Sequence, residues 1–198
     1  MGRRAVSLTA DLTKMDSIDT VIHKAIAELG RIDILVNNAG IIRRTPAMDF
    51  SEKDWDEVMS LNAKAVFFLA QAAARDMVKR TYGKIINIAS LLSFQGGILV
   101  PSYAASKGAV AQMTKAMANE WACQGINVNA IAPGYIATDN TKPLREDPVR
   151  SKSIVERIPA GRWGKPEDLE GSVVFLASPA SDYVNGHVLV VDGGWLAR

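Results

Sequence analysis

Three residues whose types and spacing suit proton transfer lie between positions 90 and 107 of this 198-residue chain. Lys107 follows Tyr103 by four positions, and Ser90 precedes Tyr103 by thirteen. On a helix, the i, i+4 spacing places the phenol and the ammonium on one face, one turn apart. A nearby cation lowers the pKa of a phenol, ordinarily about 10, so the pair can exchange a proton with an alcohol or a carbonyl oxygen.

The elements on either side are expected to bring these side chains together. The apolar run that ends at Ser90, GKIINIAS, is typical of a buried strand. Pro101 opens a long run with helical periodicity, and proline suits the first turn of a helix. The end of the strand would then present a hydroxyl to the start of the helix.

Strands and helices alternate along the rest of the chain. Ser51 is expected to cap one helix, and Gly30 to end another. Continuous apolar strands between helices predict a three-layer α/β/α fold with a parallel sheet covered on both faces. We expect strands at Ala5–Leu12, Ile32–Val36, Lys84–Ala89, Ile126–Ile131 and His187–Val191, helices at Met15–Leu29, Glu52–Lys79 (with a possible break), Pro101–Gln124 and Pro166–Ala177, and a lid of short helices at about 140–165.

Composition narrows the function classes. The length suggests one domain over residues 1–198, and a net charge of +2 gives no sign of a nucleic-acid surface. No apolar run approaches the ~20 residues of a membrane span. The single Cys123 excludes an intramolecular disulfide, so we expect a reducing, cytoplasmic location. His23 and His187 lack metal-ligand spacing, so we expect no metal site.

Five motifs in this order and at these intervals resemble the short-chain dehydrogenase/reductase family. They are NNAG at 37–40, Asn62 in SLNAKAVFF, Ser90, Tyr103 with Lys107, and PGYIAT at 133–138. The resemblance runs from about Ala5 to the C-terminus. It implies a Rossmann-type doubly wound sheet and hydride transfer with a nicotinamide cofactor.

The resemblance also implies roles for the catalytic candidates. Tyr103 would be the general acid/base, and Lys107 would lower its pKa and bind the nicotinamide ribose. Ser90 would orient the substrate oxygen, with Ser93 a competitor that the thirteen-residue spacing disfavours. Asn62 would position a water in a proton relay.

Two loops are implied in cofactor binding. Asn37, Ala39 and Gly40 would pass under the adenosine ribose, although a tight strand-to-helix turn is an equal interpretation. Asp11 would contact the adenine, or else cap a helix. The resemblance favours NAD and does not exclude NADP. The second loop, which would hold the nicotinamide carboxamide, comprises Pro133, Gly134, Ile136 and Thr138.

Only ten residues precede Asp11, whereas one βαβ unit needs roughly 30. The family's Gly-rich phosphate-binding turn is therefore expected to be missing, together with the first two strands and their helices. We interpret the chain as an N-terminally truncated form of a longer enzyme. A non-catalytic remnant is the alternative from another class.

The nearest resemblance is to members that act on a deoxy sugar acid of the 2-deoxy-D-gluconate or 2-keto-3-deoxygluconate type. An Arg binds a carboxylate bidentately, so Arg43, Arg44 or Arg145 are candidates, unless they are ordinary solvated arginines. Gln95 would reach sugar hydroxyls. A 3-oxoacyl carrier-protein reductase is the alternative enzyme. A homotetramer is also implied, with a stripe of small residues on the long helix at its interface: Ala105, Ala109, Met113 and Ala116.

Overall fold

A four-stranded parallel sheet forms the centre of the computed structural model, which describes residues 3–198. The strands lie side by side in chain order. This sheet confirms the predicted Rossmann-type α/β class. The strands are β1 (Ile34–Asn37), β2 (Gly83–Ile88), β3 (Ile126–Pro133) and β4 (Val188–Val191), each within two residues of its predicted bounds.

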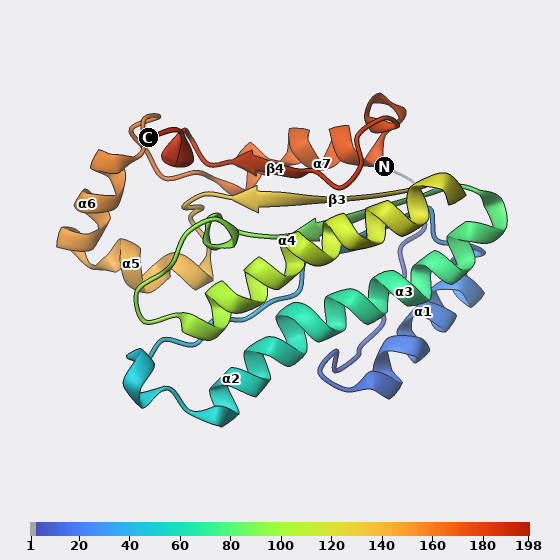
Figure 1. Ribbon diagram of the computed structural model, residues 1–198, viewed down its shortest axis with the longest axis horizontal. Helices are drawn as coiled ribbons and strands as arrows, with labels where there is room; N and C mark the ends of the chain where they lie inside the picture. The colour runs from blue at the N-terminus through green and yellow to red at the C-terminus, as the bar shows by residue number, and fades with distance from the viewer. Residues whose placement is uncertain (1–2) are drawn as a thin grey trace.

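Helices cover both faces of the sheet (Figure 1). One face carries α1, α3 and α4, and the other carries α7. The pleat explains this division, because successive side chains of a strand point to opposite faces. Ile85 of β2 packs in the cluster with α3 and α4, whereas Ile86 packs against Leu176 of α7. The helices are α1 (Met15–Leu29), α2 (Glu52–Met59), α3 (Ala65–Met77), α4 (Pro101–Trp121), α5 (Lys142–Glu146), α6 (Pro148–Arg157) and α7 (Glu170–Ala177).

The predicted strand at Ala5–Leu12 is wrong: these residues form no strand and pair with none among the residues described. A strand is stable only where its backbone N–H and C=O groups find partners. The edge strand β1 does not supply them, and its Ile34 and Val36 remain 44% and 41% exposed. Apolar sequence alone therefore did not make this segment a strand.

The helix predicted from Glu52 is interrupted by one π-helical turn. Ser51 caps α2 as expected, its Oγ accepting a hydrogen bond from the Asp54 N–H at 3.1 Å. The π-turn spans Ser60–Lys64 and contains the buried Asn62. Such bulges often occur at functional sites. The break therefore falls at a catalytic candidate.

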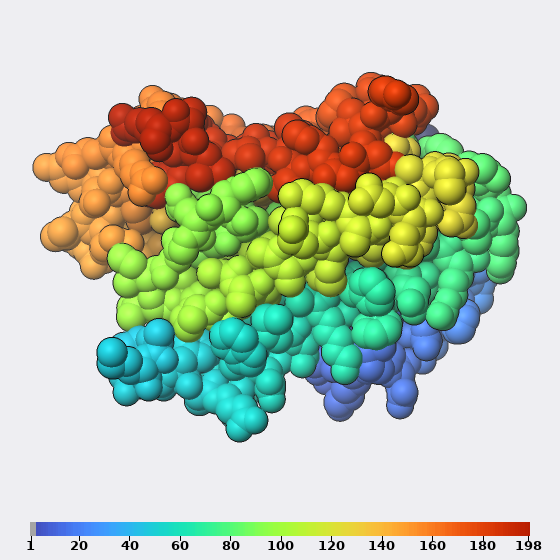
Figure 2. All heavy atoms as spheres, viewed as in Figure 1, coloured from blue at the N-terminus to red at the C-terminus, as the bar shows by residue number. Residues whose placement is uncertain are grey.

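The predicted lid consists of α5, α6 and the turns around them. It lies beyond the carboxyl end of β3 and, in orange in Figure 2, projects at one end of the molecule beside the start of α4. Ile154 and Ile158 anchor it in a small core with Leu91 and Trp195. No helix within residues 3–198 has the length and apolar character needed to cross a membrane.

Candidate active site

Two adjoining cavities open at the carboxyl ends of the strands, where parallel α/β sheets bind ligands. The first measures about 330 Å³ and lies between the start of α4 and the lid. The second measures about 550 Å³ and lies over the ends of β2 and β3. Both are lined by Ser90 and Tyr103, so these hydroxyls lie where the cavities meet.

The Ser–Tyr–Lys constellation is assembled as the spacing predicts. Lys107 is buried, and its Nζ donates a hydrogen bond to the Ile88 carbonyl at 2.5 Å. The same Nζ lies 5.6 Å from the centre of the Tyr103 ring. Ser93 has a supporting place instead: its Oγ donates to the Lys107 carbonyl at 2.7 Å and accepts from the Ser90 N–H at 3.3 Å. Ser90, not Ser93, lines the cavities.

The electrostatics of the pair differ from the expectation for Tyr103. Burial raises the pKa of Tyr103, and the Ser90 hydroxyl and the positive charge of Arg44 only partly oppose this. Burial also lowers the pKa of Lys107 to about 8. The ammonium is therefore still mostly charged at neutral pH, and it is poised to stabilise a phenolate when one forms.

Asn62 ties the NNAG loop to α4. Its Oδ1 accepts from the Ile41 N–H at 2.9 Å, and its Nδ2 donates to the Ile41 carbonyl at 2.8 Å and to Ser106 Oγ at 3.3 Å. Gly40 lies directly against it, since a Cβ there would be 3.2 Å from Asn62 Oδ1. The π-turn thus places an amide under the loop that borders Lys107.

Most of the predicted cofactor residues line the second cavity, and two do not. Asp11 holds the turn before α1, accepting hydrogen bonds from the N–H and the hydroxyl of Thr13. Asn37 is the last residue of β1 and is buried, and its Nδ2 donates a hydrogen bond to Asn87 Oδ1 on β2 at 2.9 Å. The residues that line it are Ala39, Gly40, Tyr103, Lys107, Pro133, Gly134, Ile136 and Thr138.

Gly134 has a clear packing role beside any ligand contact. A Cβ at this position would lie 2.5 Å from the Asp192 Cα, so only glycine lets the exit of β3 pass the end of β4. The close approach predicted for this glycine is therefore, in part, an approach to the protein's own backbone.

The three arginine candidates separate clearly. Arg44 lines the first cavity, and its Nη2 donates to the Asn140 carbonyl at 2.6 Å. Arg43 instead forms ion pairs with Asp54 and Glu57, at 3.5 and 2.9 Å. Arg145 is exposed, donates to the Thr138 carbonyl at 3.2 Å and lines neither cavity. The assignments of Arg43 and Arg145 are not supported, because local partners turn both away.

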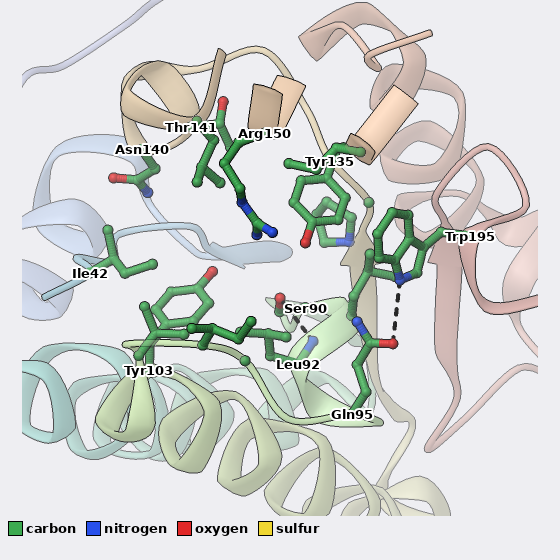
Figure 3. A pocket seen from close by; sticks show the side chains of 18 of the residues that line it. Ile42, Ser90, Leu92, Gln95, Tyr103, Tyr135, Asn140, Thr141, Arg150 and Trp195 are labelled. Atoms are coloured by element: carbon green, nitrogen blue, oxygen red, sulfur yellow. Dashed lines mark hydrogen bonds between the residues drawn. The ribbon is translucent and has the colours of Figure 1, made fainter. Parts of the chain in front are cut away.

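Several cavity residues were not singled out from the sequence. Arg150 points into the first cavity beside the Tyr135 hydroxyl (Figure 3). Trp195 Nε1 donates to Gln95 Oε1 at 3.3 Å, which fixes the predicted Gln95 on the cavity wall. The only signal for Arg150 was its place in the predicted lid, because its position opposite Tyr103 depends on the tertiary fold.

Comparisons with known proteins agree with this architecture. A family model described as enoyl-(acyl carrier protein) reductase matches residues 1–196. The 2-dehydro-3-deoxy-D-gluconate 5-dehydrogenases of Escherichia coli K12 and Bacillus subtilis 168 are 65% and 60% identical to this chain. All of this chain aligns, with 79% and 77% of theirs. The chain belongs to the short-chain dehydrogenase/reductase family.

A solved structure in the family supports the fold in detail. The gluconate 5-dehydrogenase of Burkholderia cenocepacia, in complex with NADP and tartrate, is 46% identical with a TM-score of 0.93. The alignment covers 95% of this chain and 74% of that one. The likeness therefore extends over nearly the whole of this chain's fold.

The second cavity fits part of a nicotinamide cofactor. Gly40 has no side chain, and a Cβ at this position would crowd Asn62 and narrow the cavity. The buried Lys107 ammonium lies beside Gly40. A ribose offers hydroxyl acceptors to such a cation. Lys107, Tyr103 and the loop from Pro133 to Thr138 are the residues that would hold the nicotinamide end.

Proposed function

We propose that this protein is an NAD(P)-dependent oxidoreductase that interconverts a secondary alcohol and a ketone of a deoxy sugar acid. The observation that carries the proposal is the charge of the first cavity. Arg44, Arg150 and Arg157 line it, and no Asp or Glu from the described part of the chain does. An anionic substrate is therefore drawn to the cavity that ends at Ser90 and Tyr103.

The site's own residues account for the proton chemistry. A bound nicotinamide supplies or accepts the hydride. In the reducing direction, Tyr103 donates its phenolic proton to the carbonyl oxygen, which becomes the hydroxyl, and Ser90 orients that oxygen by a hydrogen bond. The Lys107 ammonium stabilises the phenolate that remains. Asn62 keeps the neighbouring loop in place through Ile41.

The relatives favour the same substrate class. The E. coli and B. subtilis relatives are 2-dehydro-3-deoxy-D-gluconate 5-dehydrogenases, and the B. cenocepacia enzyme holds NADP and a hydroxy dicarboxylate, tartrate. We assign this chain the same ketone/alcohol exchange on a six-carbon sugar acid, with NAD or NADP as cofactor.

An acyl-thioester reductase is the second candidate, because the matching family model carries an acyl-carrier-protein description. The two functions are separated by assaying NADH and NADPH oxidation with 2-dehydro-3-deoxy-D-gluconate and with a 3-oxoacyl thioester, in parallel. We expect turnover of the sugar acid alone. Turnover of the thioester alone would replace the proposal.

A homotetramer is part of the proposal. The outer sides of α3 and α4 form a groove lined by Phe67, Met113, Ala116 and Trp121, which includes part of the predicted small-residue stripe. Light scattering of the purified chain tests this, and a monomer would contradict it. The cytoplasmic location stays a prediction, to be checked by cell fractionation.

A further inference from the structure

The first cavity holds three guanidinium groups, and they are not equivalent. Arg44 is engaged by the Asn140 carbonyl, and the Arg157 guanidinium carbon lies 3.9 Å from the centre of the Trp195 ring. Within residues 3–198, the Arg150 guanidinium forms neither a hydrogen bond nor an ion pair, and it points into the cavity (Figure 3). Its five N–H donors are therefore available to a ligand.

The lid holds Arg150 in this direction. Asp147 caps α6, its Oδ1 accepting from the N–H groups of Val149 and Arg150 at 2.9 and 3.0 Å. Arg150 shares a helical stripe with Ile154 and Ile158, the residues that pack against Leu91 and Trp195. The buried turns of α6 thus fix which way its first turn faces.

On the basis of the proposed function, we propose that Arg150 binds the carboxylate of the sugar acid and selects acids over neutral polyols. A planar guanidinium matches a carboxylate with two parallel hydrogen bonds, which a lysine cannot do. The opposite end of the substrate then lies at Ser90 and Tyr103, whose hydroxyls line the same cavity.

The neighbours of Arg150 agree with this assignment. The positive charges of Arg150 and Arg157 oppose the rise that burial causes in the pKa of Tyr135, so both guanidinium groups lie within electrostatic reach of that phenol. Tyr135 stays a neutral hydrogen-bond donor beside the arginine. A carboxylate at this point meets donors on two sides and, within the described residues, no competing anion.

Calorimetric titration tests the assignment apart from turnover. The probes are D-gluconate and D-glucitol, which differ by a carboxylate against a hydroxymethyl group. In Arg150→Gln, we expect gluconate to bind about 10- to 100-fold more weakly and glucitol to bind as it does to the unaltered chain. Two substitutions should leave both titrations unchanged: Lys152→Gln on the same helix, and Arg145→Gln, which lies outside the cavity.

Steady-state kinetics with 2-dehydro-3-deoxy-D-gluconate provide the second readout. Arg150→Gln should raise KM by a similar factor and leave kcat nearly unchanged, because the contact is made equally in the ground and transition states. Three results would overturn the inference. They are an unchanged gluconate affinity in Arg150→Gln, a loss of gluconate affinity in Arg145→Gln as large as that in Arg150→Gln, and no gluconate binding by the unaltered chain. Arg150-dependent gluconate binding without turnover would uphold it and refute the proposed function instead.

Discussion

Tyr103→Phe should lower kcat for the sugar acid about 100- to 10,000-fold, the range that one general acid/base contributes. The ring still fills the same space, so the fold and the cavities are kept. Only the proton that balances hydride transfer is lost. Initial rates at saturating substrate measure the effect, and KM should change little.

Tyr183→Phe is the matched control, because Tyr183 is fully exposed and lines neither cavity. Its kcat should equal that of the unaltered protein. If Tyr103→Phe retained more than about a tenth of the activity, the proton would have to come from another group.

Lys107→Met should lower kcat about 100- to 1,000-fold, because a preorganised charge beside the forming phenolate is removed. Met is close to Lys in size and leaves the packing of α4 in place. Lys115→Met, on the same helix at an exposed position, is the control and should keep full activity.

The same substitution carries a pH signature in stability. Burial lowers the pKa of Lys107 from 10.5 to about 8. Between these two pH values the unfolded chain binds a proton that the folded protein does not, so the folded state gains stability as pH rises. We expect the free energy of unfolding of the unaltered protein to rise by about 3 kcal/mol relative to Lys107→Met across this window.

Urea unfolding of the two proteins at a series of pH values measures that difference. Lys115→Met, compared in the same way, should show no such pH dependence. A constant gap between the unaltered protein and Lys107→Met would mean that Lys107 is not titrating in a buried site.

Short-range patterns predicted much of the arrangement of Ser90, Tyr103 and Lys107. Tyr103 and Lys107 lie on one helix, so their mutual placement follows from the four-residue spacing. Ser90 follows the end of β2 by two residues, and it lines the same cavity as Tyr103 at the start of α4. A local rule therefore determines the placement of Tyr103 relative to Lys107, whereas Ser90 reaches them through the packing of β2 against α4.

The candidate substrate residues could be predicted only in part, since Arg44 and Gln95 line the first cavity but Arg43 and Arg145 do not. Arg43 has the right chemistry, but Asp54 and Glu57 on the neighbouring helix pair with it. Arg150 faces the cavity because Ile154 on the same helix, and Ile158 just after it, pack on Leu91 and Trp195 from distant parts of the chain. Which of several chemically similar arginines faces the cavity thus depends on long-range packing. Long-range packing also decides that the segment predicted as the first strand has no pairing partner in the described residues.

Transfer of deuterium from NADPH to the sugar acid tests the central claim most directly. The reduced cofactor, labelled at the nicotinamide carbon that gives up the hydride, is incubated with 2-dehydro-3-deoxy-D-gluconate and the purified chain, and the product is analysed by mass spectrometry. We predict one deuterium on the carbon that carries the new hydroxyl, and none in the presence of Tyr103→Phe on the same timescale. Unlabelled product, or no product from the unaltered chain, would contradict hydride transfer at the site formed by Ser90, Tyr103 and Lys107.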